Sequence, residues 1–126
     1  MALNVLLDTH VFLWWRTNDR QLSPAAHDAI AEAEVAFISV ASAWEIAIKQ
    51  GLGKLVFDED IESGVRDSGF EKLPIAFAHA QAVSRLPAHH NDPFDRMLIA
   101  QARTEDLALV TRDRRFADYD VPLIWT

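Results

Sequence analysis

The sequence predicts an α/β protein in which helices cover both faces of a parallel sheet. Two observations lead to this fold class. Short, nearly continuous apolar segments recur along the chain, which is typical of strands buried on both faces. Segments with the apolar spacing of helices separate them, and strands that alternate with helices form parallel sheets.

The first half of the chain is predicted to contain two strands and three helices. Leu3 to Leu7 is a continuous apolar segment and indicates a central strand. A helix is expected to begin within Val11 to Trp15. Ser23 to Glu34 opens with Ser-Pro, the residues favoured at a helix N-cap and first position. Val35 to Val40 is the second strand, and Ala41 to Gln50 is a helix that the next residue, a glycine, should end in a left-handed conformation.

The second half continues the same alternation. Asp58 to Ser68 is an acidic helix that is also followed by a glycine. Phe70 to Ile75 and Val121 to Trp125 are strands expected at the edges of the sheet, because each contains a proline, which cannot donate to a ladder. Between them, Ala76 to Leu86 is helical and Leu107 to Thr111 is a strand.

The segment His89 to Ala102 joins a polar turn to an amphipathic helix. Asp92, which a proline follows, indicates the N-cap of this helix. Asp95 lies in the first turn, where a carboxylate meets the positive end of the helix dipole. It also shares a helical stripe with the apolar residues three, four and seven positions later, and that stripe should face the core. A carboxylate in this position needs a partner.

Length and composition indicate a single domain over residues 1–126. A chain of this size buries roughly two thirds of the surface of its unfolded form, and no linker or repeat interrupts it. The absence of cysteine excludes disulfides and thiol nucleophiles and fits a reducing cytosol. No apolar segment approaches the ~20 residues that span a bilayer, and Met1 to Asn4 lack the basic start of a signal peptide. We therefore expect a soluble, cytoplasmic protein with no membrane partner.

Four acidic residues are candidates for a common site. Asp8 and Asp113 directly follow predicted strands, and parallel sheets bind ligands beyond the carboxyl ends of their strands. Capping of the next helix or turn is an equally open role for each of them. Glu45 shares a helical stripe with the apolar residues Trp44 and Ile48. Because burial of an unpaired carboxylate costs several kcal/mol, Glu45 and Asp95 should be protonated, paired or metal-bound.

Convergence of these acids would require a counter-charge. Two carboxylates about 4 Å apart repel by about 4 kcal/mol at an effective dielectric of 20. One or two Mg²⁺ or Mn²⁺ ions suit an all-oxygen site, and they support phosphoryl chemistry by activating water and neutralising phosphate charge. The net charge of −7 argues against a nucleic-acid partner, but two such ions would offset more than half of it.

Four segments form a pattern that is specific in combination. They are Leu6 to His10, Ser42 to Lys49, His89 to Ala102 and Val110 to Asp113. With these segments in this order, the chain resembles PIN-domain ribonucleases of the VapC type, the toxins of type II toxin–antitoxin systems. The resemblance implies a five-stranded PIN-like three-layer sandwich, metal-dependent endoribonuclease activity on RNA, an antitoxin protein as partner, and a homodimer. It implies catalytic and metal-binding positions at Asp8, Glu45, Asp95 and Asp113.

Further residues are candidates for substrate contacts. Thr9 and Thr111 adjoin site acids and could orient a carboxylate, although threonine is also common at strand ends. Arg96 and Arg112 lie beside the acids in sequence, and a guanidinium can bind phosphate oxygens with two parallel hydrogen bonds. Of the remaining arginines near the acids, Arg115 is interpreted as solvated surface.

Two alternative assignments rest on weaker patterns. The adjacent His89 and His90 suggest a transition-metal site, but neighbouring side chains point in different directions and no further ligand spacing supports them. Trp14 and Trp15 are expected to pack or to face a partner, with base stacking as the alternative.

Two alternative functions also remain open. A metal-dependent phosphatase or phosphoacceptor domain would gather acids at the same strand ends, but it needs a lysine after a late strand, and none follows Lys72. A catalytically idle PIN-like RNA-binding or scaffold domain would keep the same acids.

Overall fold

Five parallel strands form the central layer of the structure, a computed structural model that describes residues 3–126. The strands are β1 (Asn4–Leu7), β2 (Val35–Ser39), β3 (Glu71–Leu73), β4 (Ala108–Thr111) and β5 (Leu123–Trp125). They lie in the order β3, β2, β1, β4, β5, and each neighbouring pair is parallel. The predicted sheet is confirmed, as are the edge positions of the third and fifth strands. Met1 and Ala2, the start of the segment predicted not to be a signal peptide, lie outside the described residues.

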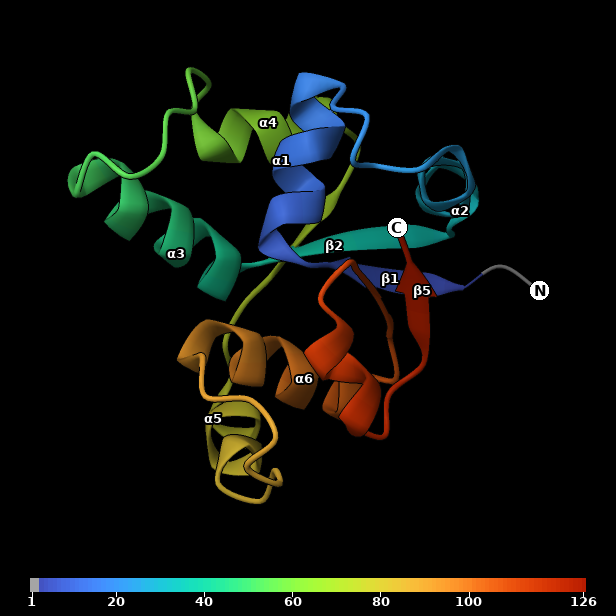
Figure 1. The fold of residues 1–126 in the computed structure, drawn as a ribbon, viewed down its shortest axis with the longest axis vertical. Helices are drawn as coiled ribbons and strands as arrows, with labels where there is room; N and C mark the ends of the chain where they lie inside the picture. Colours follow the sequence, from blue (N-terminus) through green and yellow to red (C-terminus); the bar gives the residue numbers. More distant parts are fainter. Residues whose placement is uncertain (1–2) are drawn as a thin grey trace.

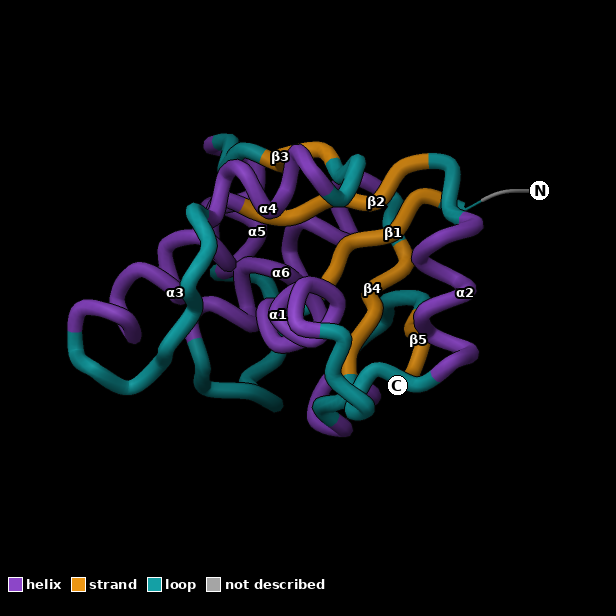
Figure 2. Tube along the Cα trace, turned by 90° about the horizontal axis from the view of Figure 1, so that it is seen from above, coloured by secondary structure: helices purple, strands orange, loops and turns teal. Residues whose placement is uncertain are grey.

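Helices cover both faces of this sheet (Figures 1 and 2). One face carries α1 (Thr9–Thr17), α2 (Pro24–Glu32), α3 (Val40–Gly51) and α4 (Ile61–Asp67). The opposite face carries α5 (Phe77–Val83), α6 (Pro93–Glu105) and the 3₁₀ helix η1 (Arg114–Asp118). The predicted three-layer sandwich is therefore confirmed. Over residues 3–126, no helix is both long and apolar enough to cross a membrane.

The side chains of β1 alternate between two hydrophobic cores. Val5 and Leu7 belong to the core beneath α1 and α2. Leu6 points to the opposite face, where it belongs to the core that includes Leu98 and Ile99 of α6. All five side chains are buried. Burial on both faces explains why the sequence of β1 is continuously apolar.

The order of the strands reverses beside β1. From β1 the chain proceeds to β2 and β3 on one side, and it then crosses to β4 and β5 on the other side. The connections that leave the carboxyl ends of β1 and β4 therefore diverge, which is where open parallel sheets bind ligands. Asp8 follows β1 at this edge, and Asp113 follows β4 two residues after its end.

Three helix boundaries differ from the prediction because of their caps. Helix α3 does not end with a left-handed Gly51: this residue is helical, and the left-handed residue is Gly53, with φ of 70°. The N–H groups of Gly53 and Lys54 donate back to the last turn, to the carbonyls of Gln50 and Lys49, which is the pattern of a Schellman motif. Helix α1 begins at Thr9, because Asp8 caps it, and α4 begins at Ile61, because Asp60 caps it.

The predicted buried stripe of α3 is only partly correct. Ala41 and Glu45 are buried, but Trp44 is 60% exposed and Ile48 is also exposed. The ring of Trp44 instead packs edge-on against Phe94 of α6, with 5.2 Å between ring centroids.

Candidate active site

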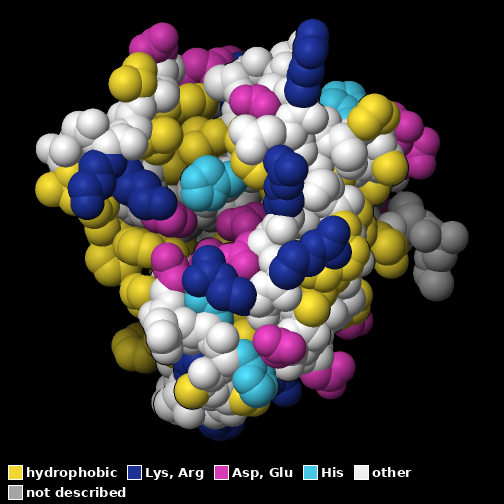
Figure 3. All heavy atoms as spheres, in the orientation of Figure 1, with side chains coloured by type: hydrophobic (Ala, Val, Ile, Leu, Met, Phe, Trp, Pro, Cys, Tyr) yellow, Lys and Arg dark blue, Asp and Glu magenta, His cyan; other side chains and the backbone are white. Residues whose placement is uncertain are grey.

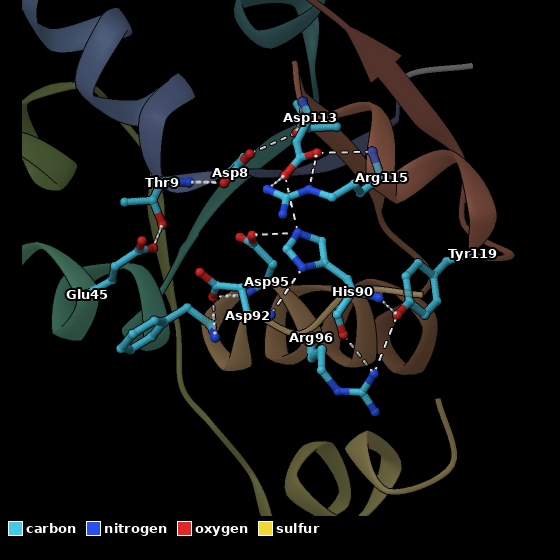
Figure 4. Close-up of polar contacts among 12 residues, drawn as sticks. Asp8, Thr9, Glu45, His90, Asp92, Asp95, Arg96, Asp113, Arg115 and Tyr119 are labelled. Atoms are coloured by element: carbon cyan, nitrogen blue, oxygen red, sulfur yellow. Dashed lines mark hydrogen bonds and ion pairs between the residues drawn. The ribbon is translucent and has the colours of Figure 1, made fainter. Parts of the chain in front are cut away.

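The four predicted acids lie together at the carboxyl end of the sheet (Figure 4). A hollow of about 580 Å³ opens there. Its lining includes the residues Asp8, Glu45, Asp95, Asp113, Asp92, His10, Trp14, Gln21, Lys49, Arg112 and Arg115. Side chains from the ends of two strands and from the helices α3 and α6 are therefore brought to one place.

Asp8 both caps a helix and faces the hollow. One carboxylate oxygen, Oδ1, accepts a hydrogen bond of 2.7 Å from the backbone N–H of Thr9, at the start of α1. The other, Oδ2, accepts one of 2.8 Å from the hydroxyl of Thr111, at the end of β4. Burial raises the pKa of Asp8, and the hydrogen bond from Thr111 partly opposes this rise. Asp8 therefore both caps α1 and presents a carboxylate to the hollow, the two roles that the sequence left open.

Glu45 is 4% exposed and has two partners. Its Oε1 accepts a hydrogen bond of 2.7 Å from the hydroxyl of Thr9. Its Oε2 lies 2.8 Å from Nζ of Lys49, one helical turn later on α3. Thr9 and Thr111 therefore each donate to a site acid, as the sequence suggested, and together they tie the ends of β1 and β4 to α3.

The pKa of Asp95 is strongly raised by its surroundings. Asp92 caps α6 as predicted, accepting from the N–H groups of Phe94 at 2.8 Å and Asp95 at 3.1 Å. This cap places the Asp95 side chain toward the hollow. Burial, followed by the negative charges of Asp8 and the other nearby acids, raises the pKa of Asp95 to about 8. The carboxylates are therefore close enough to oppose one another's ionisation.

The pKa of Asp113 is shifted in the opposite direction, below its usual value. Although its partial burial acts to raise it, hydrogen bonds from Arg115 and His90 lower the pKa of Asp113 to about 2. The Arg115 guanidinium contacts both carboxylate oxygens, with Nε 3.0 Å from Oδ1 and Nη2 2.8 Å from Oδ2. Asp113 also caps η1 by accepting from the backbone N–H of Arg115 at 3.0 Å. Arg115, interpreted from the sequence as solvated surface, is thus bound to a site acid.

His90 is the site residue that the sequence argument set aside. Its buried ring lies between two acids, with Nε2 2.9 Å from Oδ2 of Asp95 and 3.2 Å from Oδ2 of Asp113. Because Nδ1 accepts from the backbone N–H of Asp92 at 3.1 Å, the proton of a neutral ring lies on Nε2. His89 does point elsewhere, edge-on to Tyr119 at 5.3 Å. The sequence feature that would have pointed to His90 is its position, two residues before the aspartate that caps α6.

The two candidate arginines have different environments. Arg112 lines the hollow and donates to Oε1 of Gln21 at 3.2 Å, so its position fits the expected substrate contact. The guanidinium of Arg96 instead donates to four backbone carbonyls, those of Val83, Leu86, Pro87 and His90. Arg96 is not among the residues that line the hollow, and its donors hold the preceding loop, so the structure gives no support to the predicted substrate contact.

The two tryptophans also separate. Trp14 lines the hollow, with its ring centroid 6.0 Å from that of His10. Trp15 stacks on His27 at 4.5 Å and packs against the core, as a packing role predicts.

The donor set fits a divalent cation. Carboxylate oxygens of Asp95 and Asp113 and a ring nitrogen of His90 lie within 4.8 Å of one another. Because Nε2 of the neutral His90 ring carries its proton and Nδ1 accepts from Asp92, the two carboxylates are the ligands and His90 orients them. Asp8 adds a carboxylate whose charge already opposes the ionisation of Asp95. Carboxylate oxygens suit hard ions such as Mg²⁺ and Mn²⁺.

Comparisons with known proteins point to one family. The sequence model of the PIN domain matches residues 5–122. Ribonuclease VapC22 of Mycobacterium tuberculosis is 31% identical over 125 residues, which cover 94% of this chain and 93% of that protein. Among solved structures, VapBC2 from Rickettsia felis, bound to a promoter DNA fragment, has a TM-score of 0.72 at 16% identity and 98% coverage of both chains. A toxin–antitoxin complex from Klebsiella pneumoniae has a TM-score of 0.67 at 18% identity and 95% coverage of both.

Proposed function

Since the chain belongs to the PIN-domain family, we propose that it is a divalent-metal-dependent endoribonuclease and the toxin of a toxin–antitoxin pair. The observation that carries this proposal is the cluster of four acids at the carboxyl ends of β1 and β4. Burial and repulsion by the nearby acids raise the pKa of Asp95 to about 8. A bound cation would offset this repulsion and favour the ionised carboxylate. The likeness to a protein named a ribonuclease supports RNA as the substrate.

Asp8, Asp95 and Asp113 would hold the cation, with Glu45 as a further acidic group of the site. A bound Mg²⁺ or Mn²⁺ supplies positive charge that promotes attack by water and stabilises the charge that develops on the phosphate. Thr111 fixes Oδ2 of Asp8, and Thr9 fixes Oε1 of Glu45. Cleavage would leave a 5′-phosphate and a 3′-hydroxyl.

The other parts of the proposal concern assembly and place of action. We include one nuclease domain over residues 1–126, an antitoxin that blocks the site, a homodimer and action in the cytoplasm. The antitoxin is supported by the similar fold of a chain solved in a toxin–antitoxin complex. The phosphatase alternative lacks the lysine it would need, since none follows Lys72. The idle-domain alternative is disfavoured because all four acids are present and converge.

Removing a site carboxylate tests the activity. Asp8→Asn and Asp95→Asn are each expected to abolish cleavage of a single-stranded RNA in excess Mg²⁺, because each removes a ligand charge from the cluster. Cleavage is followed by gel electrophoresis, and sequencing of the new ends checks for 5′-phosphates. Asp58→Asn, an exposed aspartate away from the hollow, is the matched control and should cleave like the parent protein. Full activity of either site variant would refute the metal-dependent mechanism.

Expression in cells tests the toxin half separately. Induction of the parent gene is expected to stop growth, and induction of Asp8→Asn is not. Co-expression of the small gene that lies beside this one should restore growth. If the chain cleaves RNA in vitro but never slows growth, the ribonuclease activity stands and the proposed role as a toxin is refuted.

A further inference from the structure

Two cations of the chain are bound to acids on opposite sides of the active-site hollow. Lys49 of α3 pairs with Glu45, and Arg115 of η1 pairs with Asp113. Asp8 and Asp95 lie between these two acids in the close-up view (Figure 4). On the surface, Lys and Arg side chains border the acidic patch on more than one side (Figure 3). The acidic residues of the hollow therefore lie between two basic side chains, Lys49 and Arg115.

Both cations are accessible from solvent. The Lys49 side chain is 38% exposed and that of Arg115 is 65% exposed. The pair of Arg115 with Asp113 faces solvent, and such pairs contribute little to stability, typically less than about 1 kcal/mol, so a phosphate can replace Asp113 at small cost. Glu45 is buried, so Lys49 keeps this partner and presents its remaining ammonium donors to a phosphate. The Arg115 guanidinium already presents two parallel donors to a carboxylate, and the same fork fits two phosphate oxygens.

An RNA strand needs such cations at this place. The chain has a net charge of −7, so long-range attraction does not bring a polyanion to the acidic cluster. Contacts with phosphates supply most of the non-specific affinity for nucleic acids. The phosphate to be cut must lie at the acids, and its neighbours along the strand must then pass over the two sides of the hollow.

We propose that Lys49 and Arg115 bind the RNA phosphates that flank the scissile one, so that a single strand crosses the carboxyl end of the sheet from α3 to η1. This inference rests on the proposed ribonuclease function. Lys49 and Arg115 are then substrate-binding residues, and Arg112 also lines the hollow that the strand crosses.

The salt dependence of RNA binding tests this assignment. The background is Asp8→Asn in Mg²⁺, which the proposed function expects to bind without cleaving, and the probe is a short, labelled single-stranded RNA of mixed sequence. Fluorescence anisotropy over a range of KCl concentrations gives the slope of log K against log [KCl]. Arg115→Gln is expected to weaken binding and to reduce the magnitude of this slope by about 0.7, the value for one lost phosphate contact with a single strand. Lys49→Gln should do the same, and Arg115→Lys should keep the parent slope.

Matched controls come from two ion pairs elsewhere on the surface. Lys72 pairs with Glu62, and Arg66 pairs with Asp67, and neither cation lines the hollow. Lys72→Gln and Arg66→Gln remove the same charges from the same kinds of pair and should leave the slope unchanged. If Arg115→Gln leaves the slope unchanged, or if the controls change it equally, the inference is wrong.

Two further measurements keep the outcome clear. If Lys49→Gln does not fold because Glu45 loses its partner, the comparison is made between Glu45→Gln and Glu45→Gln/Lys49→Gln, which leave no buried carboxylate at this position. Cleavage by the chain with its native sequence is measured in parallel. Cleavage with an unchanged slope in Arg115→Gln refutes only the phosphate contacts, whereas no cleavage of any RNA refutes the proposed function itself.

Discussion

At the scale of single residues, His90 links two acids of the site whose pKa values are shifted in opposite directions. Its Nε2–H group lies between Asp95, whose pKa is about 8, and Asp113, whose pKa is about 2. The ring is fixed from behind by the N–H of Asp92 and lies 5.6 Å from the ring of Phe116. His90 therefore sets the orientation of two carboxylates from different elements.

Replacing this ring should weaken metal binding. His90→Phe keeps an aromatic ring beside Phe116 but removes both nitrogens, so that Asp95 and Asp113 lose their shared donor. Groups that orient metal ligands typically contribute about 10–100-fold to metal affinity, and we expect a loss of this size in calorimetric titration with Mn²⁺. His89→Phe is the matched control, because His89 faces Tyr119 and not the acids. Equal affinity of His90→Phe and the parent protein would contradict this role.

The site acids could be predicted from sequence because local rules place them. Asp8 and Asp113 follow strands, and the Asp92 cap fixes the first turn that holds Asp95. His90 and Arg115 could not be predicted in the same way. The direction of a loop side chain depends on which groups the tertiary fold places opposite it, and Asp113, one of the two partners of His90, is 23 positions away in the sequence.

At the scale of secondary-structure elements, Arg96 fastens the loop that precedes α6 to the helix itself. Its two terminal nitrogens donate to carbonyls of residues 83, 86, 87 and 90 at 3.0–3.3 Å. Tyr119 assists from beyond η1, because its hydroxyl donates to the carbonyl of Pro87 and accepts from the N–H of His90. The loop is therefore held by buried or half-buried side chains, although it contains no regular structure.

Removing this guanidinium should destabilise the fold. Arg96→Met retains most of the apolar stem but removes the side-chain donor from the carbonyls of Leu86 and His90, and one of two donors from those of Val83 and Pro87. Because single hydrogen bonds to charged groups contribute about 1.5–3 kcal/mol, we expect a loss of roughly 2–4 kcal/mol in the free energy of unfolding, measured with urea. Arg103→Met changes the same side chain on an exposed position of α6 and should shift stability by less than about 0.5 kcal/mol. A similar loss in both variants would show that the loop contacts are not responsible.

Helix starts were predicted from the sequence more accurately than the buried faces of helices. The caps formed by Ser23 and Asp92 fixed two helix starts, because an N-cap depends only on residues within one turn. The apolar stripe of α3 was a weaker guide. Trp44 lies on that stripe, yet its position beside Phe94 leaves it largely exposed. Periodicity identifies a face of a helix, but the neighbouring elements decide how much of that face is covered.

At the scale of the whole molecule, the acidic cluster should make the stability of the metal-free protein depend on pH. The pKa of Asp95 is about 8 in the folded protein and about 3.9 in an unfolded chain. Between these values the folded state binds more protons than the unfolded state, so stability falls as pH rises. Burial raises the pKa of Asp8 and acts in the same direction. The lowered pKa of Asp113 has its effect below about pH 4 and does not oppose this trend.

Thermal unfolding in the presence of a chelator can measure this dependence. The midpoint is expected to fall from pH 5 to pH 8, and Asp95→Asn should flatten the decline because it removes the group that must ionise. Mn²⁺ should restore stability most strongly at the upper end of the range, by about 2.7 kcal/mol at one hundred times its dissociation constant. A midpoint that rises with pH in the metal-free protein would contradict the shift assigned to Asp95.

The hydrogen bond between Thr111 and Asp8 joins residues 103 positions apart in the sequence. It also has a consequence for the protein during its synthesis. The N-terminal part of the chain leaves the ribosome first, but Asp8 acquires the hydrogen bond from Thr111 only after β4 has emerged and paired with β1. An unfinished chain therefore has no assembled site.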